Sequence, residues 1–232
     1  MPRYVNTLIL VLTLIWTTTL LAQGRGHGWM RMGGRMGANF GTVCAQMPVQ
    51  KLSNAEKEAL IYMREEEKLA RDVYLTLYEK WNFFVFNNIA RSETRHTDAV
   101  KIFLQKYKID DPVKNDSIGV FTNAKLAKLY QDLVAQGQKS LKDALAVGAT
   151  IEDVDIYDLD ENLKKTDNND IKCLFENLRR GSENHMRAFV GQLQAKGGDY
   201  KPQYISQDEY DKIMSTAEQR GGGRGMRGGR RY

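Results

Sequence analysis

One stretch of helical periodicity limits the fold most strongly, because it places charged side chains where a helix should bury apolar ones. In residues 86–103, steps of three and four residues select a single row of side chains, here called a stripe. The stripe consists of Phe86, Ile89, Glu93, His96, Val100 and Phe103. Residues with this spacing share one face of an α-helix. A buried ionisable pair is costly unless something compensates it, and Glu-x-x-His on an inward helix face is a recurring metal-ligand motif of helix bundles.

A capping box opens another helix with an interrupted stripe. Ser53 precedes Glu56 by three residues, the spacing at which each side chain can satisfy the backbone N–H of the other residue. The helix is expected to end near Lys80, and Glu67 lies on its otherwise apolar stripe. It therefore presents a carboxylate to the interior, as the segment around Glu93 does.

A long connection separates the second and third main helices. Residues 110–123 contain proline, glycine and asparagine, and a short helix is expected over residues 124–135. Such a connection can cross the full length of a four-helix bundle. The third main helix, expected over residues 140–165, carries Glu152 and Asp155 on its inward stripe.

The fourth main helix, expected over residues 169–194, carries His185 on its stripe. The acid of a second Glu-x-x-His motif would stand three residues earlier, where the chain has Ser182. The neighbouring Glu183 lies about 100° round the helix and is a poor substitute. This helix keeps the imidazole of the motif and lacks its carboxylate.

The inward ionisable side chains of the four helices make up the ligand set that a two-metal carboxylate site needs. They are Glu67, Glu93, His96, Glu152, Asp155 and His185. Oxygen ligands with two histidines suit iron or manganese, and each of two metal ions could take one imidazole. Zinc is a further candidate. Any one position alone is better explained as a solvent-facing glutamate or a core histidine, so the prediction depends on the convergence of four stripes.

The N-terminal end is expected to direct export. Residues 1–23 combine Arg3 with an apolar run over residues 8–21, which is typical of a cleavable secretory signal peptide. An uncleaved membrane anchor is the alternative. We therefore expect a periplasmic or extracellular protein. Residues 24–50, rich in glycine, methionine and arginine, are expected to be a disordered linker.

The helical domain is expected over residues 51–199, followed by a docking segment over residues 200–218 and a disordered Arg/Gly tail over residues 219–232. The net charge of the chain is +5. Residues 1–44 and 220–232 contain nine arginines and no acidic residue, so the residues between them carry a net negative charge. The basic tails could contact anionic surfaces, and no specific nucleic-acid partner is expected.

Cys44 and Cys173 are the two cysteines of the chain. An oxidising compartment would permit one disulfide between them, which would tie the segment before the first long helix to the start of the last. Spacing alone does not decide between this bridge and two unpaired buried thiols.

Four motifs carry a resemblance to a known family. They are EEEKLARDVY (65–74), IARSETRH (89–96), GATIEDVDIYDL (148–159) and ENLRRGSENHMRAF (176–189). Together they resemble the DUF2202 family of the ferritin-like superfamily, over about residues 50–205. A more distant similarity is to rubrerythrins, whose second Glu-x-x-His motif corresponds here to Ser182 and His185.

The resemblance and the ligand set together imply an all-α protein with a ferritin-like four-helix bundle and a dinuclear iron site. The expected activity is Fe(II) oxidation or peroxide reduction, with dioxygen or peroxide as the partner molecule. Two alternatives stay open: a metal-binding protein that sequesters metal without turnover, and a metal-free helical interaction protein. A homodimer is also left open.

Overall fold

The computed structural model describes residues 40–216, which form seven α-helices and, within that range, no β-strand. The helices are α1 (Phe40–Ala45), α2 (Asn54–Trp81), α3 (Phe84–Lys106), α4 (Ala124–Gly137), α5 (Leu141–Leu163), α6 (Asn169–Ala195) and α7 (Gln207–Ser215). The all-α prediction is therefore confirmed for this part of the chain. The expected signal peptide, most of the expected linker and the Arg/Gly tail lie outside the described residues.

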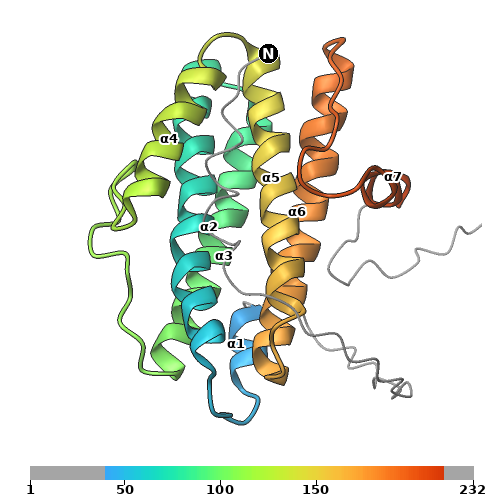
Figure 1. Ribbon diagram of the computed structural model, residues 1–232. Helices are drawn as coiled ribbons and strands as arrows, with labels where there is room; N and C mark the ends of the chain where they lie inside the picture. The colour runs from blue at the N-terminus through green and yellow to red at the C-terminus, as the bar shows by residue number, and fades with distance from the viewer. Residues whose placement is uncertain (1–39, 217–232) are drawn as a thin grey trace, which may run out of the picture. The chain divides into compact units, whose positions relative to one another are not determined.

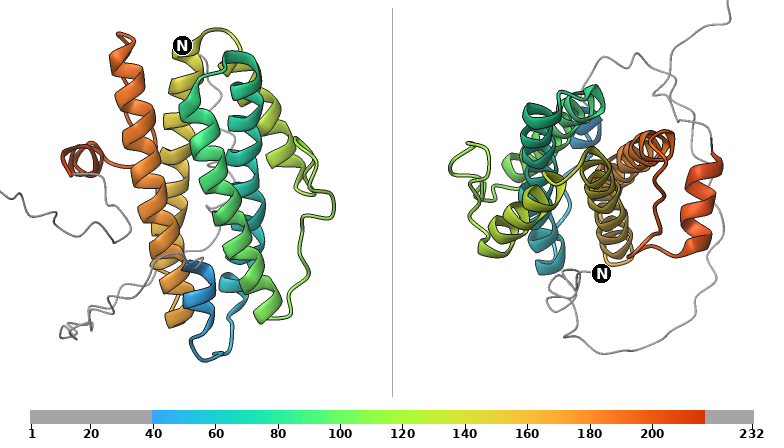
Figure 2. Two further views of the ribbon diagram at one scale, coloured as in Figure 1. Left: turned by 180° about the vertical axis from the view of Figure 1, so that it is seen from behind. Right: turned by 90° about the horizontal axis from the view of Figure 1, so that it is seen from above.

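Four long helices, α2, α3, α5 and α6, run lengthwise beside one another (Figure 1). Helix α2 packs mainly on α3, and α5 packs mainly on α6. The capping box at Ser53 and Glu56 opens α2 as predicted, and a left-handed Asn82, with φ of 45°, ends it. The connection after α3 and then α4 return along α2, so that α5 starts at the same end as α3 and runs in the same direction (Figures 1 and 2).

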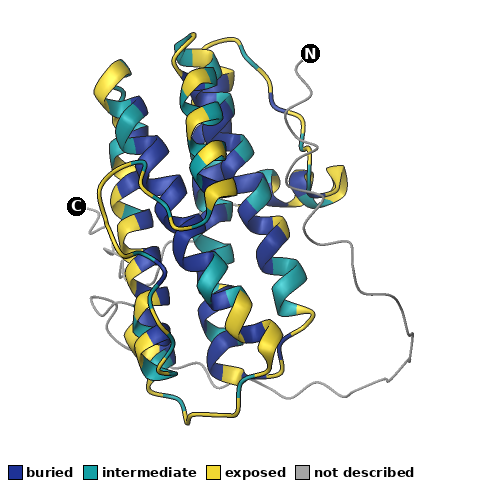
Figure 3. Ribbon diagram, turned by 60° about the vertical axis from the view of Figure 1, so that its left-hand side comes forward, coloured by how far each residue is buried: buried dark blue, intermediate teal, exposed yellow. Residues whose placement is uncertain are grey.

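Helix α2 is enclosed on all sides over residues 63–74, every one of which is buried (Figure 3). An ordinary surface helix buries only one face. Here the connection after α3 covers the other face and pairs with its charges. The bonds include Arg64 to Asp111 at 3.1 Å, Lys68 to the Ser117 carbonyl at 2.9 Å, Arg71 to Asp116 at 2.8 Å and the Asn123 N–H to Glu65 at 3.0 Å. This pairing explains why a run of charged residues can be buried.

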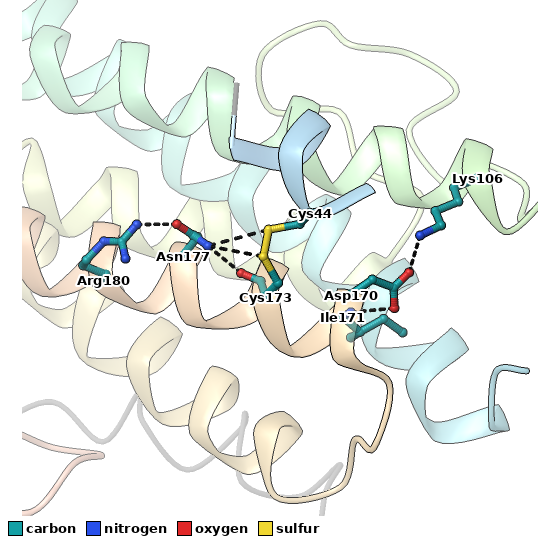
Figure 4. Close-up of a disulfide and its surroundings, with 7 residues drawn as sticks. All are labelled: Cys44, Lys106, Asp170, Ile171, Cys173, Asn177 and Arg180. Carbon is teal, nitrogen blue, oxygen red and sulfur yellow. Dashed lines mark hydrogen bonds and ion pairs between the residues drawn. A yellow bond between two sulfur atoms is a disulfide. The ribbon is translucent and has the colours of Figure 1, made fainter. Parts of the chain in front are cut away.

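A disulfide joins Cys44 of α1 to Cys173 of α6, which resolves the alternative that spacing left open (Figure 4). The side-chain amide nitrogen of Asn177 lies 3.7 Å from one sulfur and 3.8 Å from the other. Residues 40–45 form helix α1, although they fall in residues 24–50, which were expected to be a disordered linker. The Gly/Met/Arg composition gave no sign of this, because the tie to α6 spans 129 residues of sequence.

The C-terminal segment is held on α5 by one buried carboxylate. Asp153 accepts hydrogen bonds from the Tyr200 hydroxyl at 2.8 Å and from the backbone N–H groups of Gln203, Tyr204 and Ile205 at 2.6, 3.2 and 3.0 Å. Helix α7 then lies against α6 (Figure 2). Within residues 40–216, no helix is both long and apolar enough to cross a membrane.

The apolar core consists of two clusters. One includes Phe86 and Phe189, and the other includes Phe103 and Leu178. On α3 the residues between these clusters are Glu93 and His96, and on α6 they include Ser182 and His185. A buried polar layer therefore separates the two clusters, in the middle of the four long helices.

Candidate metal centre

The carboxylate of Glu93 lies between two imidazoles in this layer. Its Oε2 atom is 2.7 Å from Nδ1 of His96, one turn further along α3, and its Oε1 atom is 2.7 Å from Nδ1 of His185 on α6. The three side chains are buried, with exposed fractions of 2, 4 and 7%. One ligand atom from each of them lies within 4.8 Å of the others. Glu93, His96 and His185 are therefore the candidate metal-binding triad.

Two further carboxylates flank the triad, one beside each histidine. Oε2 of Glu67 on α2 lies 3.3 Å from Nδ1 of His96, and Oε2 of Glu152 on α5 lies 3.4 Å from Nδ1 of His185. Each imidazole thus faces the shared Glu93 and one carboxylate of its own. The five side chains form two similar halves that meet at Glu93.

Asp155, the sixth predicted ligand, takes a different partner. The Ser182 hydroxyl lies within hydrogen-bond distance of Oδ2 of Asp155 and, at 3.1 Å, of the Leu178 carbonyl, and its single proton can be donated to one of them at a time. Ser182 occupies the position at which a second Glu-x-x-His motif would carry its acid. The structure therefore brings together five of the predicted ligands, three carboxylates around two imidazoles, while the sixth contacts this serine.

Several ligand atoms in the layer have no hydrogen-bond partner within the described residues. They are Oε1 of Glu67, Oε1 of Glu93, Oδ1 of Asp155 and Nδ1 of His185. The Glu93 and His185 atoms lie 2.7 Å apart, but their directions do not make a hydrogen bond. Buried polar atoms are rarely left unpaired. A cation bound by these oxygen and nitrogen donors would satisfy them, so the residues present fit a metal ion.

Burial and mutual charge shift the pKa values of these groups in opposite directions. Burial raises the pKa of Glu67 to about 8, although His96 opposes the shift. Burial alone would lower the pKa of His185, but the charges of Glu93 and Glu152 raise it to about 10. Burial also disfavours the ionised form of Glu93, but the charges of His185 and His96 hold its pKa below the ordinary value. The metal-free layer therefore retains protons that a bound cation would displace.

Three residues outside the predicted set position the ligands. The Tyr74 hydroxyl donates a 2.6 Å hydrogen bond to Oε1 of Glu152. A Cβ atom at Gly181 would lie 2.4 Å from Cε1 of His96, so α6 needs glycine there. The Phe40 ring of α1 meets the His96 ring edge-on, at a centroid distance of 5.8 Å. Tyr74 was detectable as a polar group on the inward stripe of α2, whereas Gly181 and Phe40 gave no local signal.

The fold and the site define an all-helical protein with a buried glutamate–histidine centre that could hold metal. The chain belongs to the family described as Uncharacterized protein domain (DUF2202), whose pattern matches residues 56–217. It is 61% identical to the uncharacterized protein MJ0754 of Methanocaldococcus jannaschii over 177 aligned residues. The alignment covers 76% of this chain and 96% of the relative. The crystal structure of the hypothetical protein MJ0754 is similar, with a TM-score of 0.74 over 75% of this chain and 99% of the other.

Proposed function

We propose that this protein is an exported, ferritin-like metalloprotein whose dinuclear carboxylate–histidine centre holds iron and oxidises Fe(II) or reduces peroxide. The observation that carries the proposal is the buried layer in which unpartnered donor atoms of Glu67, Glu93 and His185 converge from three helices. Four long helices that each contribute an inward ligand support the ferritin-like assignment. Manganese and zinc are the alternative metals.

The two halves of the layer suggest two metal positions with Glu93 between them. His96 and Glu67 would hold one ion, and His185 and Glu152 the other, each histidine through Nδ1. Tyr74 would keep Oε1 of Glu152 occupied, leaving Oε2 toward the metal. Metal-ligand side chains commonly need such an outer partner to fix their orientation.

Iron bound here would supply redox chemistry, the two-electron reduction of a peroxide to two waters with uptake of two protons. The protein would exclude bulk water by burial and would hold the ligands in place. Glu67, with a pKa of about 8, carries a proton at neutral pH in the metal-free state and would lose it on metal binding.

The export proposal is supported by the signal-like pattern of residues 1–23 and by the disulfide between Cys44 and Cys173, a bond that persists in oxidising compartments. The partners would be metal ions with dioxygen or peroxide. The tails would be available to anionic surfaces, and a homodimer is compatible with the proposal.

Metal analysis after reconstitution with Fe(II) tests the centre. We expect the wild-type protein to retain iron through desalting, and the His96→Ala/His185→Ala variant to retain none. Glu58→Gln, which changes an exposed acid of α2, is the matched control and should bind like wild type. If the wild-type protein retains no more iron than the double variant, the proposal is overturned. Stopped-flow mixing of the Fe(II)-loaded protein with peroxide then tests the activity, which requires oxidation faster than that of free Fe(II).

The second candidate function is metal sequestration without turnover. It is favoured by one observation, the hydrogen bond from Ser182 to Asp155, which occupies the carboxylate nearest to the missing acid. This alternative is supported if the protein retains iron but peroxide oxidises the bound Fe(II) no faster than free Fe(II). A metal-free interaction protein would retain no metal in either experiment.

A further inference from the structure

The turn between α2 and α3 presents aromatic side chains at one end of the four long helices. It reads Trp81-Asn82-Phe83-Phe84. Phe84 is 68% exposed and is the most exposed large apolar side chain among the described residues. Its ring lies 6.3 Å from that of Tyr78, between centroids, and Trp81 and Phe83 beside it are half-buried. The turn is therefore a small aromatic surface rather than one isolated exposed side chain.

Helix α3 also begins without the residues that usually begin a helix. Its N-cap is Phe83, whose side chain makes no capping hydrogen bond, and its first turn contains no acidic residue. By contrast, α2, α4 and α5 begin with Ser53, Asn123 and Ser140, whose side chains accept a backbone N–H. Such polar residues are preferred at this position. The partial positive charge at the start of α3 is thus left without an acid or a side-chain cap, next to the exposed ring.

Two lysines lie directly over the aromatic rings of this turn. Nζ of Lys80 is 5.5 Å from the centroid of the Trp81 ring, and Nζ of Lys196, just after α6, is 5.5 Å from the centroid of the Phe83 ring. Both lysines are exposed. A lysine can keep its aliphatic part on an apolar surface while its ammonium group reaches a polar layer. The rings and the charges therefore face the solvent together.

Hydrogen bonds bring further helix ends to the same place. The Trp81 indole N–H donates to the Gly137 carbonyl at the end of α4, at 2.9 Å, and Nζ of Lys142 in α5 donates to the Gly197 carbonyl after α6, at 3.4 Å. Figure 1 shows these ends together at the top of the view. The turn and its surrounding lysines are called the basic aromatic end: Trp81, Phe83, Phe84 and the exposed Lys80, Lys139, Lys142 and Lys196.

The charge of the basic aromatic end is opposite to that of the domain as a whole. The exposed acids beside its four lysines are Glu79 and Asp199. Asp143, at the start of α5, is half-buried and accepts a hydrogen bond from the Ser140 hydroxyl at 2.6 Å. Residues 45–219 together carry a net negative charge. An anionic partner is therefore attracted to this end more strongly than to the rest of the domain.

We propose that the basic aromatic end docks on an anionic phospholipid bilayer, with the Phe84 ring inserted and the lysines at the headgroup phosphates. A stable protein interface buries about 800 Å² on each partner, far more than one exposed ring with half-buried neighbours offers. A bilayer surface needs less, because inserted apolar groups and each nearby lysine add to binding. The proposal involves none of the predicted metal ligands, so it stands apart from the proposed function.

Quenching of Trp81 fluorescence by brominated phospholipids tests the proposal. The experiment uses the full chain with Trp16→Phe/Trp29→Phe, which leaves Trp81 as its one tryptophan. The signal then reports on this end of the helices and not on the basic tails. We expect quenching by vesicles that contain phosphatidylglycerol, little quenching by vesicles of phosphatidylcholine alone, and a weaker effect at high salt.

Variants at exposed positions separate the apolar and the charged contributions. We expect Phe84→Ser and Lys80→Gln/Lys196→Gln each to raise the lipid concentration at half quenching by at least about fivefold. The matched controls change an apolar side chain of similar exposure, Val49→Ser, and two exposed lysines, Lys51→Gln/Lys57→Gln. These residues precede or begin α2, at its other end, and the controls should leave quenching unchanged. Circular dichroism confirms that each variant is folded.

Three results would overturn the proposal. One is binding to vesicles without quenching of Trp81, because other parts of the chain would then hold the lipid. Another is quenching that is as strong with phosphatidylcholine alone or that persists in Phe84→Ser. The third comes from sedimentation velocity without lipid: a dimer that Phe84→Ser dissociates would assign this end to a second copy of the chain.

Discussion

The imidazole rings of His96 and His185 stack across the interface of α3 and α6, with centroids 5.3 Å apart and planes inclined by 25°. The two rings stand in similar surroundings, because each has Glu93 at 2.7 Å and a second carboxylate within 3.4 Å. The sequence is less symmetric, since only α3 carries a complete Glu-x-x-His motif. In the structure, Ser182 occupies the position of the missing acid on α6 and contacts Asp155. The surroundings of His185 nevertheless remain like those of His96.

Glu93 should be the most sensitive ligand of the proposed centre, because it is the carboxylate that both imidazoles share. We expect Glu93→Gln to raise the Kd for Mn(II) or Fe(II) more than Glu67→Gln does, by at least about tenfold, or roughly 1.4 kcal/mol. Isothermal titration measures both variants. Equal losses in the two variants would show that Glu93 does not serve both halves.

Gly181 should be required for the position of His96. We expect Gly181→Ala to displace the ring, because the new Cβ would lie 2.4 Å from Cε1 and 2.6 Å from Nε2 of His96. Metal affinity should fall although alanine favours the helix. Gly191→Ala, on the same helix with no atom within 4 Å of its Cβ position, is the control and should stabilise the fold by about 0.5 to 1 kcal/mol. Similar metal affinities in the two variants would contradict the steric argument.

The metal-free protein should lose stability as the pH rises. The pKa of Glu67 is about 8 in the folded state against 4.5 ordinarily, and that of His185 is about 10 against 6.5. Both values are raised, so the folded state binds more protons, and each contribution is complete below the ordinary pKa and lost as the pH passes the folded one. Urea midpoints of metal-free protein should therefore fall from about pH 6 to about pH 9. A flat profile in the wild type, or no flattening in Glu67→Gln, would contradict this.

The disulfide should contribute strongly to stability, because it closes a long loop. Its cysteines are 129 residues apart, and loops of this size are associated with about 3 to 5 kcal/mol. Reduction should lower the unfolding free energy of the wild-type protein by this amount. Cys44→Ser/Cys173→Ser should start from the lower value and should not respond to reductant. A response in that variant would point to a different target of the reductant.

The long helices could be predicted from local patterns, because each carries its own periodicity and punctuation. Helix α2 was predicted to open with the capping box at Ser53 and to end near Lys80. In the structure Ser53 caps its start and the left-handed Asn82 ends it, two residues beyond the predicted end. The inward direction of Glu67, Glu93 and His185 could be predicted for the same reason, since a stripe position fixes the face of a helix.

Features that depend on contacts between distant segments could not be predicted in this way. Glu65 and Glu66 lie off the inward stripe of α2 and are nevertheless buried, because the connection after α3 encloses the helix, which the stripe does not reveal. The need for glycine at position 181 arises from a ring on α3. Helix α1 packs on α3 and is joined to α6 by the bond between Cys44 and Cys173, and composition encodes neither contact.

The bond between Cys44 and Cys173 also sets an order of events during synthesis. Cys44 emerges from the ribosome before every one of the six predicted ligands, and Cys173 emerges after all of them except His185. The disulfide therefore cannot close on a chain that lacks α2, α3 or α5. A nascent chain whose two thiols have become oxidised to each other is one in which almost the whole ligand set has already been translated. Trapping free thiols during translation would time this step.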